Sequence, residues 1–336
     1  MILERATGSA QGAEPESRAS PQVVGVGYAA LDYLGVVAGM PQFDDAESVK
    51  PVEWLVSGGG PVATALVALA RLGVPVAYIG LLGDEMVGHE IRREFVREGV
   101  DVTHLRHQKG LRSPTSFVLV EAGTGRRAFI SFRDRHQGFD LAPADRRMIE
   151  RARILHLDGW YPEAALPAAR IAKGAEVLVS LDAYIVSEET DEWVSLSDVL
   201  IANEPFTWRY TGHRDLEKAA GTLLDQGPRW VVTTLGERGC FVATCKECFH
   251  MPGFAVKVVD TTGAGDAFHG AFLYGLLQGW SLAHIARFAN AVGALTCRRL
   301  GGRTSIPTLD EAEGFLEGTP QPSVQGGYPS SKMRTS

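Results

Sequence analysis

Short apolar runs alternate with amphipathic helical patterns along most of the chain. Runs that are apolar at nearly every position predict strands buried on both faces, which is typical of a mainly parallel sheet. These runs fall at 23–28, 76–83, 154–159, 176–182, 198–203 and 229–236. The helical patterns fall at 60–72, 86–98, 163–173, 214–225, 265–278 and 282–297. The alternation predicts a doubly wound α/β core with right-handed crossovers and helices on both faces of the sheet.

A different pattern lies between these elements, where strand-like segments follow one another without a helix long enough for a crossover. They fall at 33–38, 52–56, 102–107, 115–121 and 126–132. We expect them to form a small antiparallel sheet, built from about 33–56 and 102–132, that lies beside the core as a lid. Because exposed lid strands have free edges and one apolar face, we also expect a homodimer through this sheet.

The two ends of the chain show no hydrophobic periodicity. Residues 1–20 and 319–336 are rich in Ser, Gly, Pro, Gln and charged residues. This composition predicts flexible tails on either side of one domain at 21–318.

The composition is that of a globular protein. Of the 336 residues, 45% are hydrophobic and 22% are charged, and the net charge of -7 comes with scattered positive residues. Without a basic stripe we expect no nucleic-acid partner. No apolar run approaches the roughly 20 residues that span a bilayer, and the N-terminal residues lack the apolar core of a secretory signal. We therefore expect a cytoplasmic protein with no membrane segment.

The cysteines are too few for a disulfide framework in a chain of this length. They are Cys240, Cys245, Cys248 and Cys297. Reduced thiols fit the cytoplasm. Cys245 and Cys248, with His250 nearby, could bind a metal, but the chain offers no second ligand pair. A surface hairpin with incidental thiols is the favoured interpretation.

The stretch DTTGAGDAFHGAF, Asp260–Phe272, holds the clearest candidate chemistry. A strand-like segment at 254–260 precedes it and a helix follows, so Gly263 and Gly265 lie at a helix N-terminus. Free N–H groups and the helix dipole favour an anion there. Asp266 fits a general base that takes a proton from a hydroxyl while the amides hold the charge of a transferred phosphoryl group. The alternative is that Asp266 only caps its helix.

Two further segments suggest places where backbone approaches a ligand. In TTLGERGC (233–240), a turn after a buried strand could bring Thr234 and backbone N–H groups to nucleotide phosphates. In SGGGPVATALVALARLG (57–73), three glycines precede a helix with a face of small residues. Taken alone, each segment is equally explained by packing.

Together these segments resemble the ribokinase (PfkB-type) family of carbohydrate kinases over about residues 23–317. The most specific match is DTTGAGDAFHGAF, and GGGPVATALVALARLG resembles a degenerate form of the family's N-terminal signature. VTTLGERG and LGGRTSIPTLDEAEGFL are also similar to family segments. The resemblance implies a central sheet with helices on both faces and a β lid. It also implies ATP with Mg²⁺ and phosphoryl transfer to a sugar hydroxyl.

The resemblance assigns roles to single positions. Asp266 matches the catalytic base, and the anion hole matches Gly263, Ala264 and Gly265. The positions that line the sugar pocket match Asp32, Gly59, Gly60 and Thr64. Those that meet the ATP phosphates, the metal or the adenine match Asn203, Thr234, Gly236, Gly239 and Asn290. Asp260 and Thr262 match a monovalent-cation site of many members, which implies K⁺.

Three positions depart from the family pattern. Ala30 and Thr64 stand where the family often has asparagine, which removes amide contacts to a sugar and makes ribose a less expected substrate. Phe206 stands where a glutamate follows Asn203 in the family, and the nearby acid is Glu204. Metal and phosphate handling is therefore expected to differ there, while Asp266 is untouched.

The substrate and the activity leave alternatives. Arg133 ends a lid strand near where sugar-acid and fructose kinases carry a substrate-facing arginine, and it would suit an anionic group; it could equally be a surface charge. Trp160 could pack on a sugar or close the core. The expected activity is that of a sugar or sugar-acid kinase. The alternatives are a nucleoside kinase of the same family, or a non-catalytic nucleotide- or metabolite-binding protein on this fold.

Overall fold

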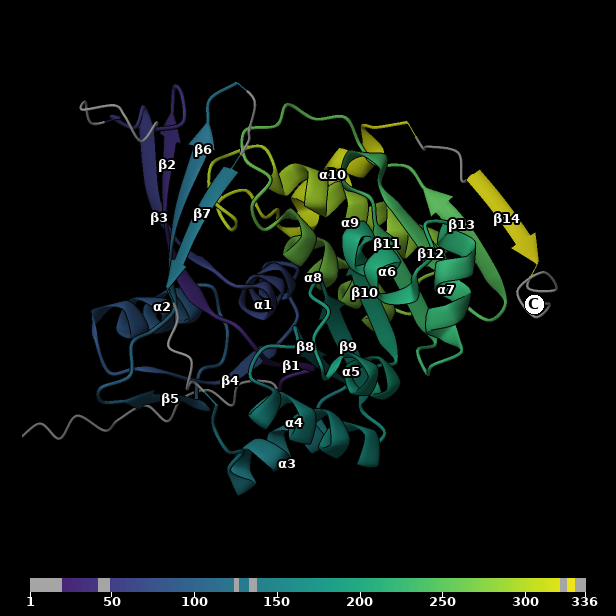
Figure 1. Ribbon diagram of the computed structural model, residues 1–336, viewed down its shortest axis with the longest axis horizontal. Helices are drawn as coiled ribbons and strands as arrows, with labels where there is room; N and C mark the ends of the chain where they lie inside the picture. Colours follow the sequence, from purple (N-terminus) through teal and green to yellow (C-terminus); the bar gives the residue numbers. More distant parts are fainter. Residues whose placement is uncertain (1–19, 42–48, 124–126, 133–137, 321–324, 330–336) are drawn as a thin grey trace, which may run out of the picture.

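The computed structural model describes residues 20–41, 49–123, 127–132, 138–320 and 325–329 (Figure 1). Its strands are β1 (Val23–Val26), β2 (Ala30–Val37), β3 (Glu53–Gly59), β4 (Val76–Gly83), β5 (Leu105–Gln108), β6 (Thr115–Glu121), β7 (Arg127–Phe132), β8 (Ile154–Leu157), β9 (Leu178–Ala183), β10 (Val199–Asn203), β11 (Trp230–Thr234), β12 (Cys240–Ala243), β13 (Glu247–Met251) and β14 (Gln325–Pro329). Its helices are α1 (Pro61–Arg71), α2 (Met86–Arg97), α3 (Pro143–Arg151), α4 (Pro162–Gly174), α5 (Thr190–Leu196), α6 (Glu204–Thr211), α7 (Leu216–Leu224), the 3-10 helix η1 (Gly236–Arg238), α8 (Ala264–Leu277), α9 (Leu282–Thr296) and α10 (Leu309–Glu317).

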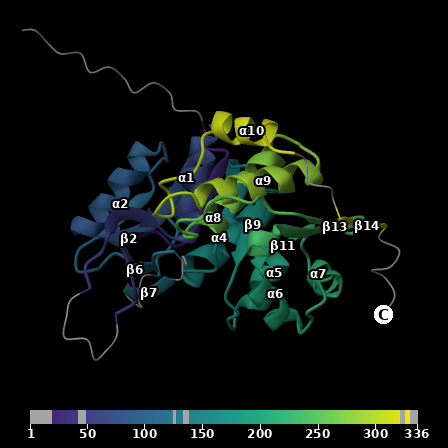
Figure 2. The ribbon, with the colours of Figure 1, turned by 90° about the horizontal axis from the view of Figure 1, so that it is seen from above.

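Within the described residues, ten strands form one large sheet in the order β14-β13-β12-β11-β10-β9-β8-β1-β4-β5. The strands from β11 to β5 in this order run parallel, and β12, β13 and β14 extend the sheet in antiparallel fashion. Val23 packs into a core that includes α1, α8 and α9, and its neighbour Val24 packs into a second core that includes α4 and α7. Figure 2 shows the sheet between these two helix layers. The predicted doubly wound fold is confirmed.

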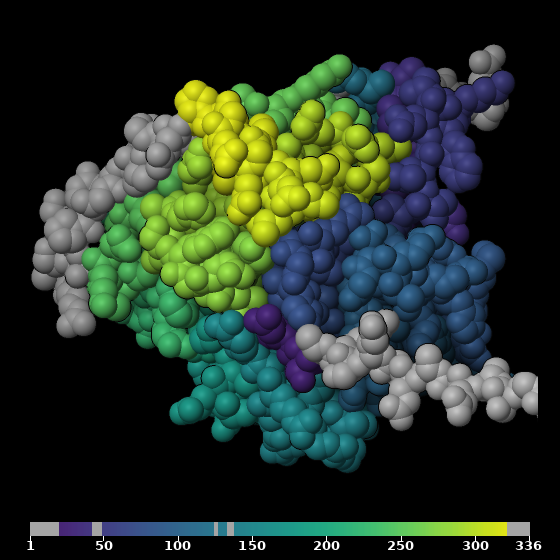
Figure 3. All heavy atoms as spheres, turned by 180° about the vertical axis from the view of Figure 1, so that it is seen from behind, coloured from purple at the N-terminus to yellow at the C-terminus, as the bar shows by residue number. Residues whose placement is uncertain are grey.

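Elements from the N-terminal and C-terminal parts of the domain lie side by side on the back of the molecule (Figure 3). There α9 and α10, drawn in yellow and green, lie beside α1 and α2, drawn in blue (Figure 3). Arg71, the last residue of α1, donates hydrogen bonds from Nη1 to the carbonyl oxygens of Arg303 and Ile306, at 2.7 and 2.9 Å. The loop between α9 and α10 is therefore tied to the N-terminal half of the chain.

The smaller sheet has the order β3-β2-β6-β7 and forms the lid. The pairs β2–β3 and β6–β7 are antiparallel, as predicted, whereas β2 and β6 run parallel. On one face, Leu34, Val118 and Val120 are buried against Leu300 of the core. The other face exposes large apolar side chains, among them Trp54, Phe117 and Ile130.

One segment predicted for the lid belongs to the large sheet instead. The prediction placed 102–107 in the lid, but β5 pairs in parallel with β4 at the edge of the large sheet. The pairing begins earlier, because Asp101 accepts a hydrogen bond from Tyr78 N and donates one to Val76 O, both of 2.9 Å. Leu105 then packs into the core with α1 and α2. The prediction grouped this segment with the lid because no helix separates β5 from the lid strand β6.

Two other predicted segments differ in the structure. The strand-like segment 254–260 pairs with no strand among the described residues, because Phe254 packs edge-to-face on Phe315 of α10 at 5.3 Å and Val259 N bonds to Cys297 O. The predicted tail 319–336 contains β14, whose backbone pairs with the otherwise free edge of β13. No helix in the described part of the chain is long and apolar enough to cross a membrane.

Candidate active site

The N-terminus of α8 lies at the carboxyl end of the parallel strands, beside the base of the lid (Figure 1). Gly263 caps the helix with φ 73°, and a Cβ there would lie 2.3 Å from Gly302 O, so the position requires glycine twice over. A Cβ at Gly265 would meet no heavy atom within 4 Å. The first N–H groups of a helix have no intrahelical acceptor. Ala264 N donates a long hydrogen bond of 3.4 Å to Thr261 O, whereas the N–H of Gly265 has no intrahelical acceptor and lies beside open space.

Asp266 lies in the first turn of α8 and is half-buried. Shielding by the protein raises the pKa of its carboxyl to about 6, against the lowering effect of the Arg303 guanidinium. The Asp32 carboxylate raises this pKa further and Arg127 lowers it. A carboxyl group with this pKa is ionised at neutral pH but is a better proton acceptor than an ordinary exposed aspartate.

Asp32 lies on β2 at the base of the lid and is buried. A Cβ added at Gly59 would lie 2.1 Å from Asp32 Oδ2, so this carboxylate rests directly against the backbone of the glycine motif. Burial raises the pKa of Asp32 to about 6, although Arg303 and the Ser116 hydroxyl lower it. The Asp32 carboxylate thus contacts the backbone of Gly59 and also raises the pKa of Asp266.

Gly60 and Thr64 begin α1. Gly60 caps the helix with φ 95°, and its Cβ would lie 2.3 Å from Tyr28 O. Thr64 is buried, and its hydroxyl accepts a hydrogen bond of 3.2 Å from Nε of Arg303. At this departure from the family pattern the threonine therefore binds an arginine of the chain itself. Arg303 was not among the predicted site residues.

Two buried carboxylates that the sequence analysis did not single out as site residues lie at the carboxyl ends of β8 and β9. Asp158 accepts hydrogen bonds from the backbone N–H groups of Tyr28 at 2.8 Å, Val62 at 3.3 Å and Trp160 at 3.1 Å. Burial raises the pKa of Asp158 to about 7. Burial and the nearby Asp266 and Asp158 raise the pKa of Asp182 well above its usual range.

These two carboxylates line a cavity of about 250 Å³. Aromatic side chains form much of the remaining wall, which includes Trp160, Tyr184 and Trp193. The Trp160 ring also packs on Tyr28, with ring centroids 5.2 Å apart. Trp160 therefore faces a cavity and supports the wall at the same time.

A histidine pair lies between β8 and α8. His156 is fully buried, and its Nδ1 lies 3.2 Å from the Ser180 hydroxyl. His269, on α8, has its ring centroid 5.7 Å from that of His156, and its Nε2 lies 3.4 Å from Asp182 Oδ1. Burial lowers the pKa of His156 to about 4 and that of His269 well below its usual range. Both rings are therefore neutral at physiological pH.

The residues predicted to meet ATP form two groups. One lies at the ends of β10 and β11, and the other lies around the carbonyl oxygen of Met251. Asn203 and Thr234 are paired in the register of β10 and β11, and the Asn203 side chain caps α6 by accepting a hydrogen bond of 2.7 Å from Phe206 N. Gly239 has φ 92° and approaches Met251 O so closely that a Cβ would lie 2.1 Å away. Asn290 donates to the same Met251 oxygen at 3.1 Å.

The departure from the family pattern at Phe206 is explained by packing. Phe206 is buried in the core, so no carboxylate lies there, and Glu204 instead pairs with Arg238 at 2.6 Å. Gly236 has φ 62° and opens the turn η1 that carries Arg238. The predicted substrate arginine Arg133 lies outside the described residues.

Asp260 and Thr262 form a compact turn in front of α8. Asp260 is fully buried; its Oδ1 accepts from Thr262 N at 2.9 Å and Thr262 Oγ1 at 2.7 Å, and its Oδ2 accepts from Gly301 N at 2.9 Å. Among the described residues this carboxylate has no ion-pair partner. A buried carboxylate held only by neutral donors fits a cation nearby.

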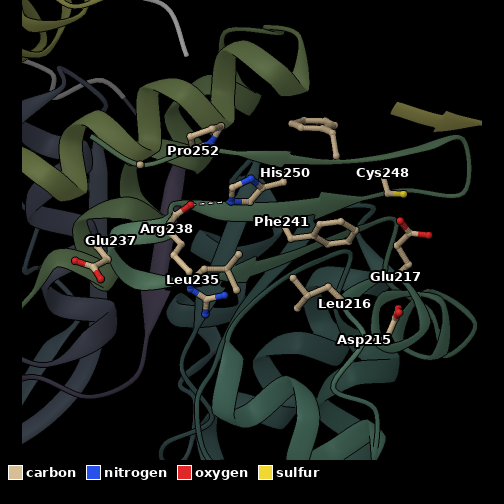
Figure 4. A pocket seen from close by; sticks show the side chains of 12 residues that line it. Asp215, Leu216, Glu217, Leu235, Glu237, Arg238, Phe241, Cys248, His250 and Pro252 are labelled. Atoms are coloured by element: carbon tan, nitrogen blue, oxygen red, sulfur yellow. Dashed lines mark hydrogen bonds between the residues drawn. The ribbon is translucent and has the colours of Figure 1, made fainter. Parts of the chain in front are cut away.

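A larger cavity of about 650 Å³ lies next to the predicted ATP turn at η1 (Figure 4). It lies between α7 and the β12–β13 hairpin, and Leu235, Glu237 and Arg238 of the turn form one wall. His250 points to this turn and its Nε2 lies 2.7 Å from Arg238 O. The cavity contains none of the predicted catalytic residues, so size alone does not mark the reacting centre. In the described part of the chain no group of three His, Cys, Asp or Glu could hold a metal ion.

Comparisons with known proteins identify the family and the fold. A family model described as pfkB family carbohydrate kinase matches residues 20–309. A ribokinase of Haemophilus influenzae is 30% identical over 84% of this chain and 94% of its own length. Fructokinase-2 of Solanum lycopersicum is 28% identical over 88% of this chain and 96% of its own length. The crystal structure of a ribokinase from Thermotoga maritima, 27% identical, superposes with a TM-score of 0.74 over 88% of this chain and 99% of that one.

Proposed function

Because the chain belongs to the PfkB family of carbohydrate kinases, we propose that it transfers the γ-phosphoryl group of ATP to a hydroxyl of a sugar or sugar acid. The observation that carries the proposal is the position of Asp266. A shielded carboxylate with a pKa of about 6 lies in the first turn of α8, next to Gly265, whose side is open to a ligand. A base and an anion hole thus share one helix end.

The proposed reaction uses these groups together. Asp266 takes the proton of the attacking hydroxyl, and the N–H groups of Gly263, Ala264 and Gly265 stabilise the charge on the phosphoryl group in flight. Asp32, held against Gly59, accepts hydrogen bonds from other hydroxyls of the sugar and so orients it. The lid covers this place and excludes water.

ATP and Mg²⁺ fit the other side of the anion hole. Asn203 and Thr234 lie side by side at the ends of β10 and β11. At the Gly239 turn there is no side chain, so a phosphate could approach the backbone. Since Mg²⁺ in such sites is held largely by phosphate oxygens and water, a cage of protein ligands is not required. Asn203 and Glu204 would face the ion, which neutralises phosphate charge.

A monovalent cation fits next to Asp260. Its buried carboxylate lacks an ion-pair partner among the described residues. The Thr262 hydroxyl already bonds to Asp260 and to Nη1 of Arg127, so the carboxylate is the ligand that the cation would use. We propose that K⁺ binds there and places positive charge beneath the anion hole.

One observation favours a second candidate substrate class. The cavity beside Asp158 and Asp182 has walls of Trp160, Tyr184 and Trp193. Aromatic walls suit the flat face of a nucleobase as well as the apolar face of a sugar ring. A nucleoside kinase activity is therefore the alternative to a sugar kinase.

The outer face of the lid supports a homodimer. Trp54 and Ile130 are 70% and 71% exposed, and Phe117 lies between them on the same face, stacked on Tyr33 at 5.4 Å. A contiguous apolar face of this kind is typical of a subunit interface. The cysteines are thiols rather than disulfides in the described residues, which fits a cytoplasmic location.

The test is an assay of ADP formation with MgATP across ketoses, aldoses, sugar acids and nucleosides, with and without K⁺. We expect turnover with at least one class, and stimulation by K⁺. Asp266→Asn should lower kcat by roughly 10² to 10⁴ while ATP binding remains. If no acceptor supports ADP formation, or if Asp266→Asn turns over like the wild type, a non-catalytic binding protein is the better description.

A further inference from the structure

Arg303 is a fully buried arginine next to the proposed reaction site. It lies in the loop between α9 and α10, and its side chain, 1% exposed, extends into the interior beside α1 and α2. A guanidinium group keeps its charge in the interior of a protein. Burying this charge is costly unless a counter-ion and hydrogen bonds compensate for the lost hydration.

The guanidinium binds the wall of the proposed sugar pocket. Nη2 donates a hydrogen bond of 2.8 Å to Gly59 O, and Nε donates one of 3.2 Å to the Thr64 hydroxyl. The other side of Gly59 is in contact with the Asp32 carboxylate, since a Cβ there would lie 2.1 Å from Oδ2. Arg303 therefore holds, from behind, the strand end that faces Asp32.

Glu94 of α2 is the counter-ion. Its Oε2 lies 3.2 Å from Nη1 of Arg303, and this carboxylate is also buried. The pair fills the space beside β3, because a Cβ at Gly58 would lie 1.9 Å from Glu94 Oε2 and 2.1 Å from Arg303 Nη1. Gly58 is thus the glycine that makes room for the ion pair.

The charges around the proposed base come from several elements. The carboxylates are Asp32 from β2, Asp158 after β8 and Asp182 from β9. Two cations oppose them, Arg127 from the lid strand β7 and Arg303. Arg127 is exposed and its charge is screened by water and salt. Arg303 is the buried one, and it has the larger lowering effect on the pKa of Asp266.

On these grounds we propose that Arg303 is a positioning residue of the kinase site. Paired with Glu94, it fixes the Gly59 carbonyl and the Thr64 hydroxyl that wall the sugar pocket, and it places a permanent positive charge behind Asp32 and Asp266. The inference rests on the proposed function, because it concerns the same base and the same pocket.

The variants separate this role from simple stabilisation. Arg303→Met leaves Glu94 buried without its partner and should lower the melting temperature. Arg303→Met with Glu94→Met replaces both charges by apolar groups of similar length and should recover most of that loss. Arg303→Lys keeps the charge but loses the planar contact to Gly59 and Thr64. Arg71→Met is the matched control, because Arg71 ties the same loop through the Arg303 and Ile306 carbonyls.

Two readouts are measured on each folded variant. The first is the dependence of kcat/KM on pH, whose acid limb is expected near pH 6 in the wild type. The double methionine variant removes the Glu94 charge along with that of Arg303, but Arg303 is the one of the two that lowers the pKa of Asp266, so this limb should still move up by about 0.5 pH unit. The KM for the sugar should also rise. Arg303→Lys should raise KM while the limb stays near the wild-type value. Arg71→Met should change only the melting temperature.

The second readout needs no catalysis. The carboxyl ¹³C shift of Asp266, assigned with Asp266→Asn, gives its titration midpoint in the free protein. We expect the same upward shift in the double variant. If the double variant folds with the midpoint, the acid limb and KM of the wild type, the inference is wrong. If the wild type itself phosphorylates nothing, the proposed function fails, and the titration still decides whether Arg303 sets the charge state of Asp266.

Discussion

Arg127 on the lid strand β7 donates a hydrogen bond of 2.9 Å from Nη1 to the Thr262 hydroxyl, in the turn before α8. The two residues are 135 positions apart in the sequence, so the contact joins the lid to the helix end that carries Asp266. The same guanidinium lowers the pKa of Asp266. The lid thus brings a positive charge to the place where a phosphoryl group would be transferred.

Replacing Arg127 should therefore impair turnover more than stability. We expect Arg127→Met to lower kcat/KM by roughly 10- to 100-fold, because one positive charge near the developing phosphoryl charge is lost. Its melting temperature should stay close to that of the wild type, since the side chain is exposed. Steady-state kinetics and a thermal melt provide the two measurements.

Thr262→Val distinguishes a direct role of Arg127 from a role through Thr262. If Arg127 acts only by holding the turn, Thr262→Val and the double variant should equal Arg127→Met. A larger loss with Arg127→Met than with Thr262→Val shows that the guanidinium acts on the substrate or phosphoryl group itself.

The pH dependence of the reaction should report Asp266. Because burial raises its pKa to about 6 and the base must be ionised, kcat/KM should rise with pH and level off above about pH 7. Initial rates between pH 5 and pH 8, with a coupling system tested at each pH, measure the limb. A midpoint near 4, the value of an ordinary exposed aspartate, would show that this carboxyl is not shielded when the enzyme works.

Gly265 and Gly263 should respond in opposite ways to a single methyl group. Gly265→Ala meets no neighbouring atom and adds helix propensity, so it should stabilise the fold by about 0.5–1 kcal/mol. The same methyl group enters the space proposed for the phosphoryl group, so kcat/KM should fall by at least about tenfold.

Gly263→Ala is the matched comparison. Its φ of 73° and the 2.3 Å approach to Gly302 O make any Cβ costly, so this variant should lose stability. Comparison of the two melting temperatures with the two kcat/KM values tests the assignment. A Gly265→Ala protein of full activity contradicts an anion site at this helix end.

The sequence predicted those parts of the site that depend on local order. The glycines, the helix start and Asp266 lie within one short stretch, and a helix N-terminus has the same chemistry wherever it packs. Arg303 was not predicted because the residues that it binds, Thr64 and Gly59, are 239 and 244 positions away in the sequence. Likewise, nothing local distinguishes β5 from a lid strand. It became part of the large sheet through its pairing with β4.

The apolar face of the lid should determine the oligomeric state. We expect Trp54→Lys with Ile130→Lys to turn a dimer into a monomer, because both side chains lie on the exposed lid face and lysine is disfavoured in a buried interface. Multi-angle light scattering at micromolar concentrations measures the mass. Val96→Lys is the control, since Val96 is an exposed apolar residue on α2, outside the lid. A wild-type protein of monomer mass rules out the proposed interface.

The buried His156 should make the fold sensitive to acid. Its pKa falls to about 4 in the folded protein, whereas the unfolded chain takes up the proton near pH 6.5. Between these values only the unfolded state binds the proton, so stability is lost as the pH falls through this window, by on the order of 3 kcal/mol. Asp158 acts in the opposite direction, because its pKa is raised to about 7 and it gains a proton in the folded state first.

The difference between a variant and the wild type isolates the contribution of His156. His156→Gln keeps a side chain that can bond to the Ser180 hydroxyl but cannot titrate. Between pH 7.5 and pH 5, urea unfolding should show that the unfolding free energy of this variant, relative to that of the wild type, becomes more favourable, whatever the net effect of the buried carboxyl groups that both proteins share. His213→Gln, at an exposed histidine, should behave like the wild type. If the unfolding free energy changes by the same amount in all three proteins, protonation of His156 does not affect the stability of the fold in acid.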